Sequence, residues 1–79
     1  MCEIVIPGVG WTQAEAIFGH LQLPETWKKD FENFGCFGYK HHDQWLSVTM
    51  PGVDVVIRVK VLTREIRKII RLIRVLIKQ

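Results

Sequence analysis

The sequence has 79 residues and a net charge of +3, and 48% of its residues are hydrophobic while 24% are charged. A chain of this length makes one domain with a modest core, and it leaves little material for the walls of an elaborate active site. We therefore expect a single domain over residues 1–79 that is not an enzyme. The composition is that of a compact protein and excludes a disordered chain.

The cysteine content and the N-terminus indicate a cellular compartment. Cys2 and Cys36 are too few for a disulfide framework. The chain opens directly into strand-like sequence, so we expect no signal peptide and a reduced, cytoplasmic protein. No apolar segment reaches the roughly 18 to 20 residues that a membrane-spanning helix needs, so we expect a protein that does not span a membrane.

The first segments predict a strand followed by a helix. Residues 2–6 are rich in β-branched side chains and end at Pro7-Gly8, which indicates a strand that enters a turn. Thr12 and Glu15 have the spacing of a capping box, and apolar residues then recur at helical spacing. We expect a helix over about residues 13–21.

A second helix is predicted from Pro24 to Phe34. Trp27, Phe31 and Phe34 lie four and three residues apart, which places them on one face of a helix. Proline suits the first position of a helix, and Gly35 is a common residue just past the end. We expect the three rings to belong to the core.

Three strands are expected after Gly35, the first over residues 37–40 with residues 41–43 as its turn. Trp45 to Met50 and Val53 to Leu62 flank Pro51-Gly52 and predict a hairpin. If Met50 lies opposite Val53, one hairpin face is wholly apolar. That face carries Leu46, Val48, Met50, Val53, Val55, Ile57 and Val59. Trp45 then lies on the other face opposite Arg58, as a cation–π pair or as part of a contact surface.

The end of the chain predicts an amphipathic helix that begins after Thr63, a good N-cap residue. At about 100° per residue, one broad arc is apolar. It carries Ile66, Ile69, Ile70, Leu72, Ile73, Leu76 and Ile77. The opposite arc is basic and is interrupted only by Val75. It carries Arg64, Arg67, Lys68, Arg71, Arg74 and Lys78.

These elements predict a small α+β domain with the order β-α-α-β-β-β-α. We expect an antiparallel sheet that is covered on one face by helices, among them the long basic amphipathic C-terminal helix. The apolar arc of that helix is expected to cover the apolar face of the hairpin.

Residues with catalytic or metal-binding chemistry are few. Cys36, His41 and His42 have side chains that bind zinc, with Cys2 or His20 as a fourth ligand. Adjacent histidines on a strand point to opposite sides, however, so we expect no metal and no cofactor. A Cys–His nucleophile pair oriented by Asp43 needs a cleft, and so small a chain has little material to form the walls of one. A metal- or Cys-dependent enzyme is therefore a distant third hypothesis.

Gly8-Val9-Gly10 lies between a strand and a helix, as in phosphate-binding loops. The third glycine of a dinucleotide fingerprint is missing, since Gln13 stands there. We interpret the glycines as a plain strand-to-helix turn.

The charge is divided unevenly along the chain. Residues 1–52 hold three Lys and Arg against six Asp and Glu, whereas residues 53–79 hold eight against two. An anionic partner is thus expected for the last third. Alternatively, the acidic part neutralises the basic helix within the molecule or across a homodimer, or the basic arc is merely a solvated face.

These patterns favour a non-enzymatic interaction protein. We expect a small regulator or inhibitor, of the kind that bacteriophages encode, that docks an acidic protein surface through the basic arc. Trp45 and Arg58 are expected to add contacts. The alternative hypothesis is direct nucleic-acid binding through the same basic arc.

Overall fold

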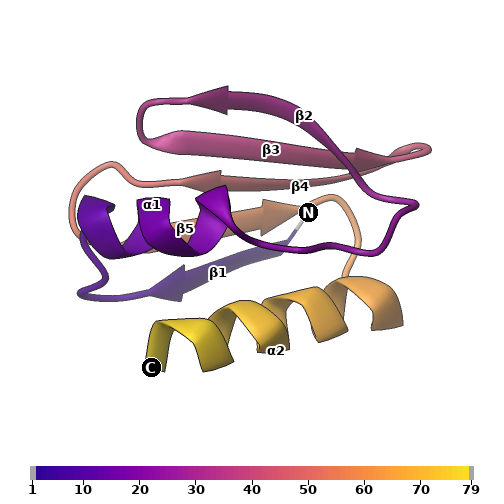
Figure 1. Ribbon diagram of the computed structural model, residues 1–79. Coiled ribbons are helices and arrows are strands. Elements are labelled where there is room, and N and C mark those ends of the chain that lie inside the picture. The colour runs from indigo at the N-terminus through magenta and orange to yellow at the C-terminus, as the bar shows by residue number, and fades with distance from the viewer. Residues whose placement is uncertain (1, 79) are drawn as a thin grey trace.

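The computed structural model describes residues 2–78, except the side chain of Lys78, and contains seven elements (Figure 1). They are β1 (Cys2–Ile6), α1 (Trp11–Gly19), β2 (Lys28–Asn33), β3 (Cys36–His41), β4 (Gln44–Thr49), β5 (Val55–Val59) and α2 (Arg64–Lys78). The strands form one antiparallel sheet in the order β1-β5-β4-β3-β2. No helix within residues 2–78 is long and apolar enough to cross a bilayer.

Both helices pack on the same face of the sheet, and the core lies between them and that face. α2 supplies four buried isoleucines, and α1 supplies Phe18 and Ala14. Gln13 of α1 donates from Nε2 to the carbonyl oxygen of Ile77 at 2.8 Å, which joins the two helices. The predicted α+β class, with an antiparallel sheet covered on one face by helices, is confirmed.

The predicted apolar face of the β4–β5 hairpin is confirmed over the paired residues. Its buried members are Leu46, Val48, Val55, Ile57 and Val59. Met50 is partly buried, whereas Val53 is exposed, which corrects its predicted place in the core. Val53 lies in the connection between the strands, where it has no partner across the sheet.

The predicted hairpin register is wrong by two residues. Val48 lies opposite Ile57 instead of Val55, and residues 50–54 form a longer connection than the tight Pro51-Gly52 turn. Gly10, which is not part of the hairpin, holds this connection by donating its amide to the carbonyl oxygen of Val53 at 2.9 Å. A shift by an even number keeps every side chain on its predicted face.

The predicted helix from Pro24 to Phe34 is wrong, because residues 28–33 form the edge strand β2. β2 pairs with β3, and Phe34-Gly35 makes the turn between them with a φ of 78° at Gly35. Trp27 is buried as expected, but Phe31 and Phe34 are exposed. All residues of β2 are exposed, so the strand has no buried face whose alternation could mark it in the sequence.

The helix α1 begins at Trp11, two residues before the predicted start. Gly10 takes the N-cap position and no side chain caps the helix, so the predicted capping box of Thr12 and Glu15 does not form. Trp11 instead packs near the β2–β3 turn, with its ring centroid 4.6 Å from that of Phe34. This packing fixes the start of α1 against the opposite half of the sheet.

Candidate functional site

The helix α2 is oriented by its cap and by its buried isoleucines. The amide of Ile66 donates to Thr63 Oγ1 at 3.2 Å, so the predicted N-cap is confirmed. Ile66, Ile69, Ile70 and Ile73 are buried against the sheet, and Leu76 and Ile77 are partly buried beside them. This packing turns the opposite side of the helix to solvent.

The solvent side of α2 carries five exposed cations, which we call the basic face. They are Arg64, Arg67, Lys68, Arg71 and Arg74. None of them makes an ion pair within the described part of the chain. Lys78 was predicted to join them, but its side chain lies outside the described residues. The basic face therefore presents its charge to solvent.

Apolar side chains lie within and beside this basic face. Val75 is 50% exposed among the cations, as predicted, and Leu72 is 40% exposed at their margin. The placement of Leu72 in the apolar arc is thus only partly right, because it faces a groove of about 410 Å³. That groove is lined by Leu23, Pro24 and Ile69, with Lys68 at its side.

Trp27 links the start of α2 to the sheet, a contact that the sequence did not indicate. Its indole Nε1 donates to Glu65 Oε1 at 3.0 Å, and its ring centroid lies 5.4 Å from that of His41. Glu65 is the one acidic residue of α2, and this bond holds its carboxylate beside Trp27. Glu65 also lines the groove beside Lys68, but it makes no ion pair with a cation of the basic face within the described residues.

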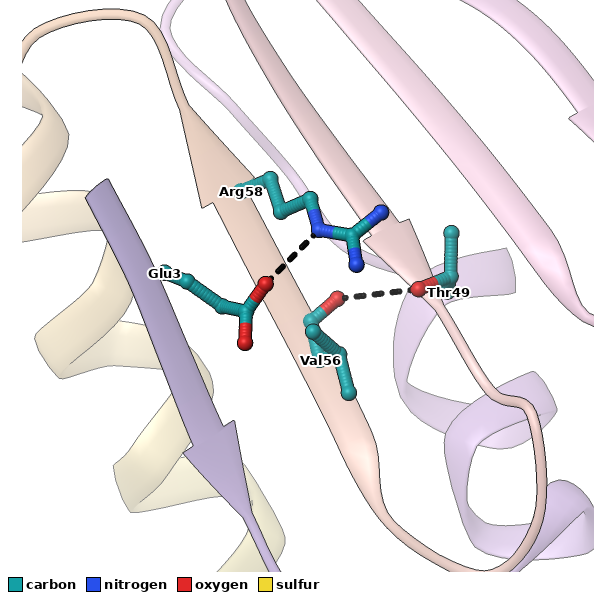
Figure 2. A network of polar contacts seen from close by, with 4 residues as sticks. All are labelled: Glu3, Thr49, Val56 and Arg58. Atoms are coloured by element: carbon teal, nitrogen blue, oxygen red, sulfur yellow. Dashed lines mark hydrogen bonds and ion pairs between the residues drawn. The ribbon is translucent and has the colours of Figure 1, made fainter. Parts of the chain in front are cut away.

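The predicted pairing of Trp45 with Arg58 is wrong because of the register. Trp45 lies opposite Lys40 of β3, and Arg58 lies opposite Ser47. Arg58 donates from Nε to Glu3 Oε2 at 2.9 Å across β1 and β5, as Figure 2 shows beside the contact of Thr49 with Val56.

Trp45 and Arg58 also lie on the far side of the sheet from α2. Their neighbours in the strands, Leu46 and Ile57, point into the core that α2 covers, and side chains alternate along a strand. The structure therefore does not join these two residues and the basic face into one contact surface.

Cys36 and the two histidines do not meet. Cys36 begins β3 and His41 ends it, which separates them by about 16 Å at the usual rise of a strand. His41 has its Nδ1 at 2.8 Å from the carbonyl oxygen of Thr26. Among the described residues, no group of three or more His, Cys, Asp or Glu side chains could hold a metal ion.

The amides of the Gly8-Val9-Gly10 turn are used inside the molecule. Gly8 donates to Asp54 Oδ1 at 3.0 Å, and Gly10 donates to the Val53 carbonyl. Both glycines have positive φ, of 72° and 80°, which favours glycine at these positions. The turn therefore binds the β4–β5 connection, and these two amides are not free for a phosphate.

Comparisons with known proteins complete the description. The chain matches no protein-family model, and searches of curated proteins and of solved structures gave no match either.

Proposed function

We propose that this chain is a non-enzymatic interaction protein that docks an acidic protein surface through the basic face of α2. A small regulator or inhibitor, such as bacteriophages encode, is the class we infer. The observation that supports this is the mixture on α2: five exposed cations without ion pairs in the described chain surround Val75 and border Leu72.

This mixture favours a protein partner over a phosphate backbone. Protein interfaces combine apolar anchors with a charged rim, and a side chain that fills a pocket contributes most of the binding energy. The groove between Leu23 and Leu72 has room for such an anchor, and both Lys68 and Glu65 line it. Phosphates offer no apolar group to Leu72 or Val75.

Nucleic acid is the second candidate, because unpaired cations on one helix side would also neutralise phosphates. The 15-residue helix is about 22 Å long and straight, and it spans few phosphates. The acidic first part of the chain, with three cations against six acids in residues 1–52, opposes a wider backbone contact. We therefore rank it below the protein partner.

Two double variants with equal net charge test the proposal. Arg67→Glu with Arg71→Glu reverses the basic face, and Lys28→Glu with Lys40→Glu reverses two exposed lysines of β2 and β3 as the matched control. Each variant and the wild type serve as bait in lysate of the source cells, with and without nuclease treatment. We expect a protein that the wild type and the lysine variant retain and that the arginine variant loses.

Two results would contradict the proposal. Equal capture by the arginine variant would remove the basic face from binding. Capture that disappears after nuclease treatment would assign the face to nucleic acid.

A further inference from the structure

The sheet face that points away from the helices is uncovered, and it carries aromatic and basic side chains together. We call this face the outer face. Tyr39 and Leu46 point into the core, so their neighbours Lys40 and Trp45 point outward. Phe31, opposite Gly38 on the edge strand, is 38% exposed on the same face. Trp45 is partly buried, so two aromatic rings lie close together and partly open to solvent on this face, which makes it a candidate contact surface.

Phe31 and Trp45 border a hollow of about 240 Å³, which we call the ring hollow. Gly38 and Ser47 lie between them, and Lys40 and Asp30 complete the lining. The rings come from β2 and β4, on either side of β3. The hollow thus offers aromatic surface together with a hydroxyl, an ammonium and a carboxylate.

Gly38 is required for this shape. A Cβ at this position would overlap the ring of Phe31, which rests directly on the glycine backbone. Gly38 has no positive φ, so its backbone would accept alanine. The Phe31 ring can therefore occupy its position only because residue 38 has no side chain, whereas the backbone conformation of the strand does not require glycine.

A second hollow, of about 550 Å³, adjoins the first, and we call it the lysine hollow. Lys28 lies directly opposite Lys40 in the β2–β3 register, and neither makes an ion pair within the described chain. Like charges directly across a strand pair destabilise a sheet unless an anion lies between them. His41 and His42 line the same hollow.

His41 is held at this hollow by a backbone contact. A carbonyl oxygen only accepts, so the 2.8 Å contact of His41 with Thr26 places a proton on Nδ1.

Asp30 connects the two hollows. The register of β2 slips between Lys29 and Phe31, so Asp30 has no partner on β3 and forms a bulge. Asp30 and Lys40 both line the ring hollow and the lysine hollow. One ligand can therefore reach both hollows across these two residues.

We propose that the two hollows together bind a nucleotide, with its base in the ring hollow and its phosphate in the lysine hollow. Bases stack on aromatic side chains of open sheets, and lysines neutralise the phosphate. Asp30 accepts a hydrogen bond from the base or from a ribose hydroxyl. The nucleotide is either free or one unit of a single strand, since both present the same ring and phosphate.

The test follows backbone amide and tryptophan indole signals by NMR during titration with adenosine monophosphate, a single-stranded adenine pentanucleotide and inorganic phosphate. We expect the Gly38 and Ser47 amides and the Trp45 indole to shift, while amides of α2 stay in place. Equal affinity for the first two probes assigns the site to a free nucleotide. An affinity at least roughly tenfold higher for the pentanucleotide assigns it to a single strand.

Two variants separate this site from the rest of the molecule. Gly38→Ala displaces the Phe31 ring toward solvent and should weaken nucleotide binding by about tenfold, with the sheet signals otherwise preserved. Lys28→Glu with Lys40→Glu should weaken it by at least as much. Arg67→Glu with Arg71→Glu, on the other side of the sheet, should bind like the wild type.

Several results would overturn the proposal. Inorganic phosphate that binds as tightly as the nucleotide would remove the ring from recognition. An acidic decapeptide of glutamate that displaces the nucleotide with equal affinity would make the outer face a protein surface. Unchanged binding by Gly38→Ala or by the lysine variant, or no shifts at millimolar nucleotide, would leave the hollows without this ligand. None of these outcomes bears on the basic face, so the two proposals fail separately.

Discussion

Tyr39 shows how one buried polar group is accommodated. It is 3% exposed, and its hydroxyl has no hydrogen-bond partner among the described residues. Burial, and to a lesser degree the negative charge of Glu32, raise the pKa of Tyr39 from 10.0 to about 12. The hydroxyl therefore stays protonated in the folded protein, and its loss of hydration is not repaid by a hydrogen bond.

Tyr39→Phe should accordingly stabilise the fold by about 1 kcal/mol at neutral pH, since it removes a buried unpaired hydroxyl. A pKa that is higher in the folded state gives stability that is complete below pH 10.0 and is lost as pH rises toward about 12. The advantage of the variant should thus widen across that interval. Urea unfolding of both proteins from pH 8 to pH 11 measures this, and a constant difference would contradict the cause.

Lys28 gives a second prediction at this scale. Lys28→Glu turns the like-charged pair with Lys40 into an opposite pair and should raise stability by about 0.2 to 1 kcal/mol. Lys28→Gln removes the repulsion without the attraction, so it should lie between the two in thermal unfolding. If all three proteins unfold at one temperature, the two ammonium groups do not repel each other.

Among the elements, β2 explains why part of the fold could not be predicted. The spacing of Trp27, Phe31 and Phe34 fits a helix, but each ring has another reason for its place. Trp27 is buried before the strand, Phe31 covers Gly38, and Phe34 contacts Trp11 from the turn. These contacts are made with residues that are distant in the sequence, and the local periodicity carries no information about them. In contrast, α2 and the β4–β5 hairpin bury one side each, and their periodicity predicted which side is buried, although not the register of the hairpin.

The role of α2 in stability can be measured with adjacent residues. Ile73 is fully enclosed, so Ile73→Ala should cost about 2 to 5 kcal/mol, a large part of the roughly 4 to 12 kcal/mol expected for a domain of this size. Leu72→Ala, one position earlier and 40% exposed, should cost at most about 1 kcal/mol. Urea denaturation of the pair checks this, and equal losses would mean that α2 is not packed as described.

For the molecule as a whole, the sequence predicted the basic face, but of the outer face it indicated only Trp45. The basic face follows from a single helix and its period, so five of its six predicted residues are found exposed. The ring hollow is built from Phe31, Gly38 and Trp45 on three different strands, beside the bulge at Asp30. Because the predicted hairpin register is wrong by two residues, the predicted pair of Trp45 and Arg58 does not form. Sites built across strands require the pairing, which the sequence pattern alone leaves open.

A variant that keeps every charge tests whether the apolar residues of the basic face take part in binding. Leu72→Ser with Val75→Ser removes the apolar part of the basic face and keeps every cation. An acidic protein partner should then bind at least about tenfold more weakly, because the anchor in the groove is lost. Binding to generic duplex DNA, driven by counterion release, should be unaffected by the same change.

Salt titration of the wild type completes this comparison. A nucleic acid held by the basic face would lose affinity on a log–log plot with a slope of about −0.9 for each phosphate contacted. A protein partner should show a shallower slope, since part of its binding energy is the salt-insensitive burial of Leu72 and Val75. A steep slope, together with unchanged binding by the variant Leu72→Ser with Val75→Ser, would show that the cations alone supply the binding energy. This result would favour nucleic acid as the partner of α2.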